Sequence, residues 1–394
     1  MLIHKFDKND DLKKLSDRYF TNEDIIKKHN ELDEINPAFF EELLILTPTR
    51  TYTARYGDTL DGIGLRFSIA KKDMDAMNPS YINKELKPGD VIALKCSERP
   101  YGMSVANGYF YKDCTLKKLK EALPYLTYVT FASAIADKGG IQRIFNDDEA
   151  LQTTKNAGKI PLLRVYDKYK ERYNSDNLSE FIEALINFAK EKEYKGIVVN
   201  ACSMNDMPEK YTEFIVNLKG AMLGCDLILL TEINDASPIE FSEYSDASIL
   251  YYPKFDKAPT LSFDDGERKI FSDFATKGES ARTFIDLPSI ARLGKDYIGV
   301  NDAINLARRH KMQISTNENT LLSNFSSKQG ECRYTSLSGI KALYDLVDEY
   351  DYMGVCFDIM RSPISYFSLY NALFKSYNQA TVRSVEGCSR ARAE

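Results

Sequence analysis

Eight short apolar stretches constrain the fold of this chain more than any other feature. Each is rich in aliphatic or aromatic residues and bounded by glycine or polar residues, which is typical of buried parallel strands. They lie at residues 104–109, 128–132, 160–165, 196–201, 227–232, 247–251, 282–287 and 354–359. Amphipathic helical patterns lie between several of them, at residues 178–193, 211–223, 300–310 and 337–349. This alternation predicts an α/β fold, a (β/α)8 TIM barrel over residues 100–377, with a doubly wound sheet as the alternative.

Two segments interrupt the alternation. Residues 253–281 are rich in Asp, Lys, Gly and Ser, and we interpret them as an insertion after the sixth strand. Residues 311–335 read as an irregular segment before the last helix. Functional side chains of a TIM barrel lie at the C-terminal ends of its strands, so we expect the site of this chain there.

An internal repeat occupies the part of the chain before the barrel. Residues 3–46 and 51–94 match without a gap at an offset of 48. The matched pairs are Asp10 with Asp58, Leu12 with Leu60, Leu15 with Ile63, Tyr19 with Phe67, Asn30 with Asn78 and Leu46 with Leu94. The repeat predicts two small βααβ modules, at residues 1–48 and 49–96.

The second copy shows the pattern of such a module most clearly. A short strand at 52–55 is followed by a turn at Gly57, and Asp58 is placed to cap the first helix. The second helix ends near Asn78, and a final strand covers residues 91–94.

Three stretches of this copy resemble the LysM module, which binds glycans containing N-acetylglucosamine. They are Tyr-Gly-Asp-Thr-Leu at 56–60, Asn-Pro at 78–79 and Leu-Lys-Pro-Gly-Asp at 86–90. The first copy departs from the pattern, with Asn-Asp-Asp-Leu at 9–12 and Glu41 where the late turn glycine is expected.

The LysM resemblance implies a sugar site between the loop after the first strand and the loop before the last. The residues implied are Gly57, Asp58, Thr59, Leu60, Asn78, Pro79, Ser80, Tyr81 and Ile82. A structural alternative is that Gly57, Asp58 and Pro79 serve only turns and caps, and for Asp58 we favour that interpretation.

Tandem LysM modules before this barrel resemble the spore cortex-lytic N-acetylglucosaminidases of glycoside hydrolase family 18. The motifs that carry the resemblance lie at 107–110, 194–197, 246–252 and 354–358. The resemblance implies synthesis in the cytoplasm of a mother cell without a signal peptide, and a final place at the spore surface, coat or cortex.

The catalytic motif of that family is replaced in this chain. The family carries D-x-x-D-x-D-x-E on strand four, where the final Glu protonates the glycosidic oxygen and the preceding Asp steers the acetamido group of the substrate. Its four acidic positions fall on Lys195, Val198, Asn200 and Cys202. Strand alternation places Val198, Asn200 and Cys202 on one face.

Two further active-site strands depart from the family. Its Met-x-Tyr-Asp motif falls on residues 251–254, and Asp358 stands where the family places a tryptophan. We therefore predict a pseudoenzyme without catalytic residues. The alternative is that Glu232, Asp286 and Asp358, at the ends of strands five, seven and eight, converge as relocated acids.

Composition limits the partners. Fifty-two Lys and Arg against 58 Asp and Glu give a net charge of −6, which provides no electrostatic basis for binding nucleic acid or an anionic membrane. Seven cysteines lack C-x-x-C spacing and only three histidines are present, so we expect no metal site and no cofactor. Cys388, in the polar tail 378–394, is the candidate for an intermolecular disulfide.

Three functional hypotheses follow. The leading one is a non-catalytic protein of the spore or cell wall that binds peptidoglycan or another N-acetylglucosamine-containing glycan and uses its pseudo-chitinase barrel for docking or assembly. The second is an active family 18 peptidoglycan N-acetylglucosaminidase with relocated acids. The third is a structural subunit of a spore coat or surface appendage, with coat proteins or its own copies as partners.

Overall fold

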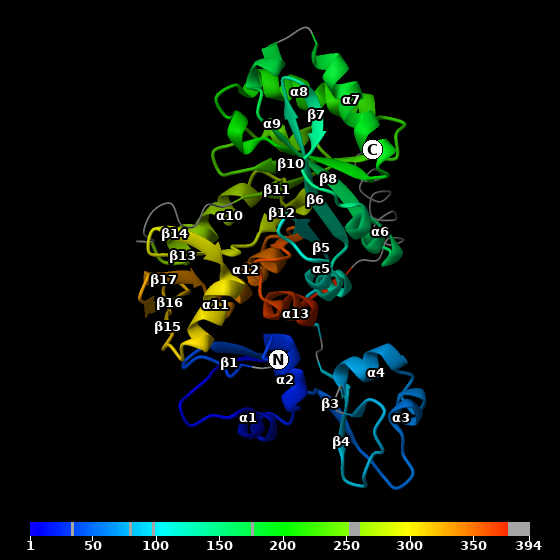
Figure 1. The fold of residues 1–394 in the computed structure, drawn as a ribbon, viewed down its shortest axis with the longest axis vertical. Helices are drawn as coiled ribbons and strands as arrows, with labels where there is room; N and C mark the ends of the chain where they lie inside the picture. Colours follow the sequence, from blue (N-terminus) through cyan, green and yellow to red (C-terminus); the bar gives the residue numbers. More distant parts are fainter. Residues whose placement is uncertain (33–34, 79–80, 97–98, 175–176, 252–260, 377–394) are drawn as a thin grey trace. The chain divides into compact units, whose positions relative to one another are not determined.

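The computed structural model describes residues 1–32, 35–78, 81–96, 99–174, 177–251 and 261–376, and the chain divides into two compact units (Figure 1). The module unit consists of Met1–Gly102, Ile290–Ala342 and Pro363–Lys375. The barrel unit contains Met103–Ser289 and Leu343–Ser362. Each unit is therefore assembled from segments that are distant in the sequence.

Eight parallel strands form the barrel. They are β5 (Met103–Phe110), β6 (Tyr128–Asp137), β8 (Ile160–Asp167), β9 (Gly196–Asn200), β10 (Ile228–Ile233), β11 (Ala247–Leu250), β12 (Thr283–Asp286) and β18 (Gly354–Asp358). The sheet closes because β5 pairs in parallel with both β6 and β18. The (β/α)8 TIM barrel predicted from the sequence is confirmed. An antiparallel strand, β7 (Gly140–Arg143), extends the sheet beside β6.

Helices follow most of these strands. They are α5 (Leu116–Ala122), α6 (Asp148–Asn156), α7 (Leu178–Glu191), α8 (Pro208–Met222), α9 (Glu240–Glu243), α10 (Lys269–Ala275) and α12 (Leu337–Glu349). Helix α7 buries Phe181, Ile182 and Leu185 on one face, as its periodicity predicts. The predicted insertion after strand six contains α10, while its residues 252–260 lie outside the described part of the chain.

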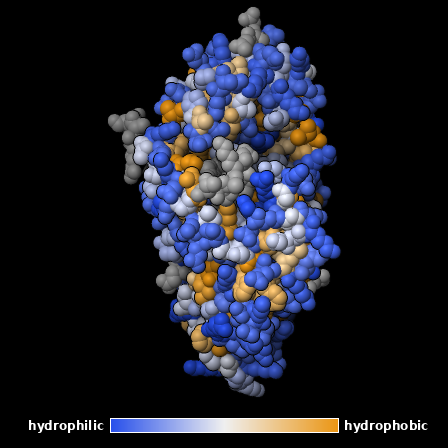
Figure 2. Space-filling model, turned by 90° about the vertical axis from the view of Figure 1, so that its left-hand side faces the viewer, coloured by the Kyte–Doolittle hydropathy of each residue, from blue (hydrophilic) through white to orange (hydrophobic). Residues whose placement is uncertain are grey.

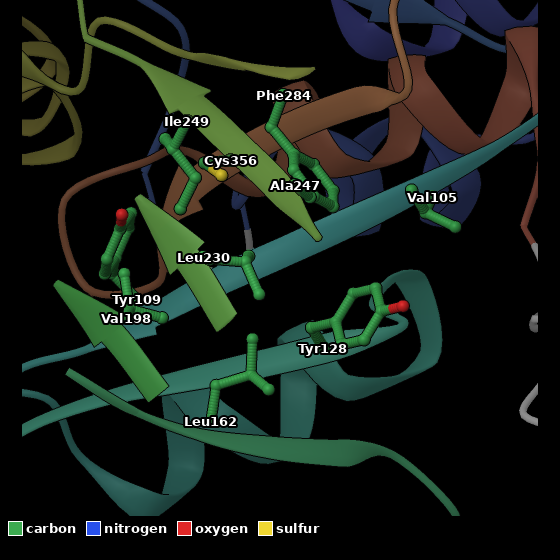
Figure 3. Close-up of a cluster of buried hydrophobic side chains, with 10 residues drawn as sticks. All are labelled: Val105, Tyr109, Tyr128, Leu162, Val198, Leu230, Ala247, Ile249, Phe284 and Cys356. Carbon is green, nitrogen blue, oxygen red and sulfur yellow. The ribbon is translucent and has the colours of Figure 1, made fainter. Parts of the chain in front are cut away.

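The barrel interior is filled by side chains from all eight strands (Figure 3). They are Val105, Tyr109, Tyr128, Leu162, Val198, Leu230, Ala247, Ile249, Phe284 and Cys356. Because strand side chains alternate with a period of two, these residues identify which positions of each strand point inward.

Both predicted modules have the βααβ order. The first contains β1 (Leu2–Lys5), α1 (Leu12–Arg18), α2 (Glu23–Asn30) and β2 (Glu42–Ile45). The second contains β3 (Arg50–Thr53), α3 (Leu60–Arg66), α4 (Lys71–Met77) and β4 (Val91–Lys95). In each module the two strands pair antiparallel, and the helices pack on them through a separate apolar core.

The same buried hydrogen bonds occur in the two modules. Asn30 donates to the carbonyls of Ile26 and Leu44 and accepts from the Leu44 amide. Asn78 does the same with Met74 and Ala93. Leu44 thus corresponds to Ala93, an offset of 49, so the sequence match of Leu46 with Leu94 is wrong by one residue.

This shift also changes which residue replaces the turn glycine. The Gly89 amide donates to Ala54, and in the first module the Phe40 amide donates to Phe6. Phe40 and Gly89 both have positive φ, 61° and 98° respectively. Phe40, and not Glu41, therefore occupies the glycine position, and Glu41 corresponds to Asp90.

The predicted cap of the first helix in the second module is also wrong. Thr59 is the N-cap residue of α3, where its hydroxyl accepts from the Gly62 amide at 3.0 Å. Asp58 instead accepts from the Arg55 amide and the Tyr52 hydroxyl, both at 2.8 Å. Asp58 therefore serves the turn, as we favoured, but not the cap.

Residues 290–335 form an antiparallel sheet with one helix. The strands are β13 (Ile290–Leu293), β14 (Asp296–Gly299), β15 (Ser315–Asn317), β16 (Leu322–Ser327) and β17 (Gly330–Thr335), and the helix is α11 (Val300–Arg309). The prediction of an irregular segment at 311–335 is wrong, because three of the strands lie there. The module unit also holds α13 (Ile364–Leu373), after which comes β19 (Lys375–Ser376).

The described helices include none that combines the length and the apolar character needed to cross a membrane. The face drawn in Figure 2 is mostly hydrophilic, with small hydrophobic spots separated by polar residues.

Candidate functional site

Polar side chains gather where the barrel strands end. Arg164, Glu232 and Asp286 lie two residues after the inward-pointing Leu162, Leu230 and Phe284, and so share their inward face. Asp358 follows Cys356 in the same way. The interior is therefore apolar in its middle and charged toward the C-terminal ends of the strands, where TIM barrels carry their functional groups.

Glu232 is the most constrained of these acids. Arg164 donates to both of its carboxylate oxygens, from Nε to Oε1 at 2.6 Å and from Nη2 to Oε2 at 2.8 Å. The Tyr109 hydroxyl donates to Oε1 at 2.8 Å. Only 6% of Glu232 is exposed. Both carboxylate oxygens of Glu232 are therefore engaged as hydrogen-bond acceptors.

Asp358 is held by a second arginine. The carboxylate accepts from the Met360 and Arg361 amides at 3.0 Å and from Arg361 Nη1 at 2.8 Å. Burial raises the pKa of Asp358, and Arg361 opposes the rise. The Arg361 guanidinium also lies 5.5 Å from the ring centre of Tyr111, which stacks on Tyr109.

Asp286 differs from the other two acids. Among the described residues, no hydrogen bond joins its carboxyl group to a partner, and the residue is half-buried. Loss of hydration raises its pKa well above the ordinary value, and the charges of Glu232 and Asp358 raise it further. Arg164 acts in the opposite direction. Asp286 is thus the acid at this site best suited to carry a proton near neutral pH.

The four replaced motif positions lie at different depths. Lys195 precedes β9 and pairs with Asp226 at 3.4 Å, at the opposite end of the strand from the mouth. Val198 is fully buried in the barrel core. Asn200 is the last residue of β9, where its side-chain oxygen accepts from the Ser203 amide at 3.4 Å.

Cys202 lies beyond the strand. It begins a 3-10 turn, Cys202–Met204, so the predicted strand alternation does not extend to it. Burial raises the pKa of its thiol to about 12, and the charge of Glu232 adds to the rise. A thiol of this kind stays protonated and is a weak nucleophile near neutral pH.

The implied sugar residues of the second module fall into two groups. Thr59 caps α3, Leu60 is 6% exposed in the module core, and both amide hydrogens of Asn78 are donated within the module. Their side chains therefore serve the fold. Gly57 and Asp58 form the turn after the first strand, and Gly57 has open space around it.

The exposed part of this region contains groups able to stack on a sugar. Tyr56, which precedes the turn glycine, is 95% exposed, and Ile82 is 38% exposed. Tyr81 is partly buried and packs against the module core. Pro79 and Ser80 lie outside the described residues, as does Cys388.

No group of three or more His, Cys, Asp or Glu residues in the described part of the chain is arranged to hold a metal ion. A groove of ≈ 570 Å³ lies on the outside of the barrel between α7 and α8. It is lined by Leu178, Ile182, Ile186, Lys190 and Cys225 among others, and it contains none of the acids of the mouth.

Sequence reasoning missed Arg164, Tyr111 and Arg361. Arg164 gave a usable signal, because it is a charged residue within an apolar strand. It lies two residues after Leu162, so strand alternation places both side chains on the same face. Arg361 and Tyr111 lie in loops just after strands and gave none. The predicted acids Glu232 and Asp358 both lie near enough to Asp286 for their charges to raise its pKa.

Residues 52–95 match the LysM domain family. The spore cortex-lytic enzyme SleL of Bacillus cereus aligns with a TM-score of 0.74 at 15% identity, over 96% of this chain and 99% of that chain. The chain has the fold of a spore cortex-lytic enzyme. The Bacillus megaterium SleL gives a TM-score of 0.71 at 16% identity, with the same coverage of 96% and 99%.

A chitinase of Chromobacterium violaceum aligns with a TM-score of 0.60 at 13% identity, over 68% of this chain and 98% of that chain. No curated protein matches the chain in sequence. The predicted resemblance, a LysM module joined to a chitinase-like barrel in the cortex-lytic arrangement, is confirmed as a likeness of fold.

Proposed function

We propose that the protein binds N-acetylglucosamine-containing glycan of the spore cortex or cell wall without cutting it. The observation that carries the proposal is the two-point contact of Arg164 with Glu232 in the barrel mouth. At the end of β9, the positions of the catalytic Asp and Glu in the resembled hydrolase family are occupied by Asn200 and Cys202. The inward acid nearest in register, Glu232 opposite Asn200, is held as an acceptor.

The second module supplies the attachment. Its Tyr56 ring is almost fully exposed next to the turn glycine. Stacking on the apolar face of a sugar would bury this aromatic surface favourably. Similarity to a LysM domain and to spore cortex-lytic enzymes supports peptidoglycan as the glycan and the spore as the location. The barrel then serves as a docking surface.

The test combines sedimentation with a chemical assay on purified cortex peptidoglycan. We expect the wild type to sediment with the glycan and to release no new reducing ends. Tyr56→Ala should reduce the bound fraction at least fivefold, whereas Tyr297→Ala, which removes an exposed tyrosine from β14, should not. Equal binding by wild type and Tyr56→Ala would contradict attachment through this module.

A second candidate function is hydrolysis with Asp286 as the proton donor. The raised pKa of Asp286 and its lack of a hydrogen-bond partner among the described residues favour it. In that reaction Asp286 would transfer its proton to the glycosidic oxygen as the bond to the sugar carbon breaks and the acetamido oxygen of the substrate bonds to that carbon. Water would then add to the same carbon, release the acetamido oxygen and return a proton to Asp286. Release of reducing ends by the wild type, and its loss in Asp286→Asn, would establish this function in place of the first.

A further inference from the structure

The two modules differ in how much of one loop is open. In the second module, Lys87, Pro88 and Gly89, which precede β4, are exposed, and Val91 is 52% exposed. In the first module the corresponding loop, residues 37–42, is buried or half-buried throughout. The modules have the same fold, so the difference comes from what covers the loop.

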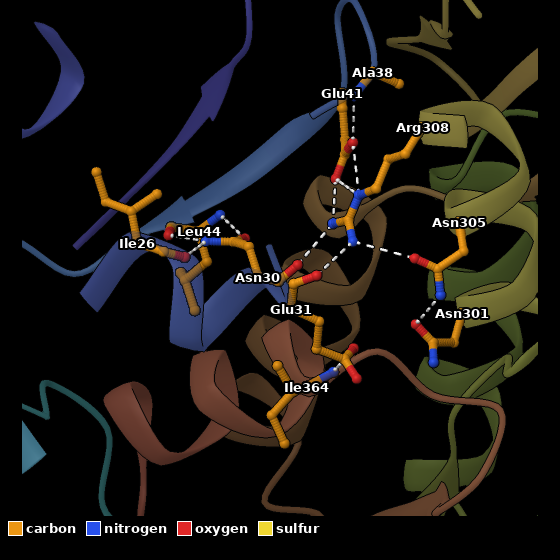
Figure 4. A network of polar contacts seen from close by, with 10 residues as sticks. All are labelled: Ile26, Asn30, Glu31, Ala38, Glu41, Leu44, Asn301, Asn305, Arg308 and Ile364. Atoms are coloured by element: carbon orange, nitrogen blue, oxygen red, sulfur yellow. Dashed lines mark hydrogen bonds and ion pairs between the residues drawn. The ribbon is translucent and has the colours of Figure 1, made fainter. Parts of the chain in front are cut away.

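Arg308 of helix α11 supplies one part of the cover (Figure 4). Arg308 lies between the loop and the end of α2, and only 6% of it is exposed. It donates to Glu41 from Nε at 3.1 Å and from Nη2 at 2.6 Å. It also donates to the Asn30 carbonyl at 2.7 Å and the Glu31 carbonyl at 3.1 Å.

Three more hydrogen bonds join the first module to residues beyond α11. The Ile314 amide donates to the Phe39 carbonyl at 2.9 Å. Glu42 accepts from the Ser338 amide at 2.8 Å, and Glu31 accepts from the Ile364 amide at 2.9 Å. The two glutamates thereby satisfy amides in the first turns of α12 and α13, which have no partner within those helices.

We infer that the first module is an internal clamp and not a second glycan site. Glu41, which is 3% exposed, and Arg308 form a buried ion pair. Arg308 also covers the carbonyls of Asn30 and Glu31, which correspond at the offset of 48 to Asn78 and Pro79 of the implied sugar site. A glycan cannot reach that side of the first module without displacing Arg308 from its buried partner. The part of the inference that concerns glycan rests on the proposed function, whereas the clamp itself does not. It implies one LysM-type glycan site per chain, on the second module.

The glycan part is tested by titrating the full chain with an N-acetylglucosamine oligosaccharide of four or five units. Lys8 is the counterpart of Tyr56 at the offset of 48 and is exposed. We expect a single site that Tyr56→Ala weakens at least tenfold and Lys8→Ala leaves within twofold. Loss of binding in Lys8→Ala, or two equal sites, would overturn the inference.

The clamp is tested without any glycan, so it can be judged even if the wild type binds none. In wild-type amide hydrogen exchange we expect the amides of residues 38–42 to exchange at least tenfold more slowly than those of residues 87–91. Arg308→Met should remove that protection, while Arg309→Met, which changes the exposed neighbour, should keep it. Equal wild-type rates in the two loops, or protection that survives Arg308→Met, would refute the clamp.

Discussion

At the scale of single residues, Glu232 sets the charge balance of the barrel mouth. It is buried, accepts from Arg164 at both oxygens, and raises the pKa of its neighbours Asp286 and Cys202. Breaking a buried ion pair from one side is costly because the remaining charge has lost both water and partner. Arg164 therefore stabilises the mouth by pairing with a buried carboxylate.

We predict that Arg164→Met destabilises the protein by about 3 kcal/mol, since it leaves Glu232 buried without its arginine. The matched control is Lys170→Met, which breaks the exposed pair with Asp206 and should change the free energy of unfolding by less than about 1 kcal/mol. Urea unfolding of both variants at pH 7 measures the difference. Similar losses in the two variants would show that the Arg164 pair is not a stabilising contact.

At the scale of elements, the two modules show how a repeated pattern specifies a repeated structure. Asn30 and Asn78 each make two buried hydrogen bonds to the final strand and a third to a carbonyl of the second helix. Loss of such a side chain leaves several buried backbone groups unpaired, and each costs about 1–3 kcal/mol. The asparagine therefore fixes the position of the final strand.

We predict that Asn78→Ala lowers the stability of the second module by about 3 kcal/mol. Lys84→Ala, an exposed change in the loop that follows, should be within about 0.5 kcal/mol of the wild type. Hydrogen exchange at the Ala93 amide, which donates to Asn78, reports the module directly. Unchanged protection of this amide in Asn78→Ala would contradict the role given to Asn78.

The elements also show what sequence patterns can and cannot predict. All eight barrel strands were found because apolar residues in short runs follow from burial on both faces. The sheet of residues 290–335 was missed because its strands are short and polar, as in β15, Ser315–Asn317. A shift of one residue in β2 was also invisible, since Leu43, Leu44, Ile45 and Leu46 fit either register.

The residues of the candidate site also differ in whether the sequence could predict them. Glu232, Asp286 and Asp358 could be named because each ends a predicted strand, and strand ends meet at the barrel mouth. Arg164 could be noticed as a charged residue in an apolar strand, but its pairing with Glu232 depends on which side chains face each other across the barrel. Arg361 contacts Asp358 through the conformation of the loop after β18, and the local sequence does not indicate that conformation.

At the scale of the whole molecule, the module unit is built from three separate segments of chain. The His29 ring in α2 hydrogen-bonds the Ser368 hydroxyl in α13 at 2.7 Å, which joins the first segment to the third. Burial lowers the pKa of His29 from 6.5 to about 4, and the charge of Lys28 adds to the effect. The ring is therefore neutral in the folded protein near neutral pH.

This predicts a pH dependence with a definite sign. Below pH 6.5 the unfolded chain binds a proton at His29 that the folded protein does not bind until about pH 4, so stability falls as the pH is lowered through this window. One proton gives a slope of at most about 1.4 kcal/mol per pH unit. Between pH 7 and pH 4.5, wild type should lose about 2 kcal/mol more than His29→Asn in urea unfolding. Parallel losses would exclude His29 as the source.

The buried pair of Glu41 and Arg308 joins residues separated by 267 positions in the chain. During translation the ribosome releases the N-terminus first, so Glu41 leaves the exit tunnel long before its arginine is made. Until Arg308 has been synthesised, the first module has Glu41 without its arginine and the loop of residues 37–42 without its cover. The second module does not depend on Arg308 and can fold earlier. Chaperones that act on this polypeptide during synthesis should therefore meet the first module in an unfinished state.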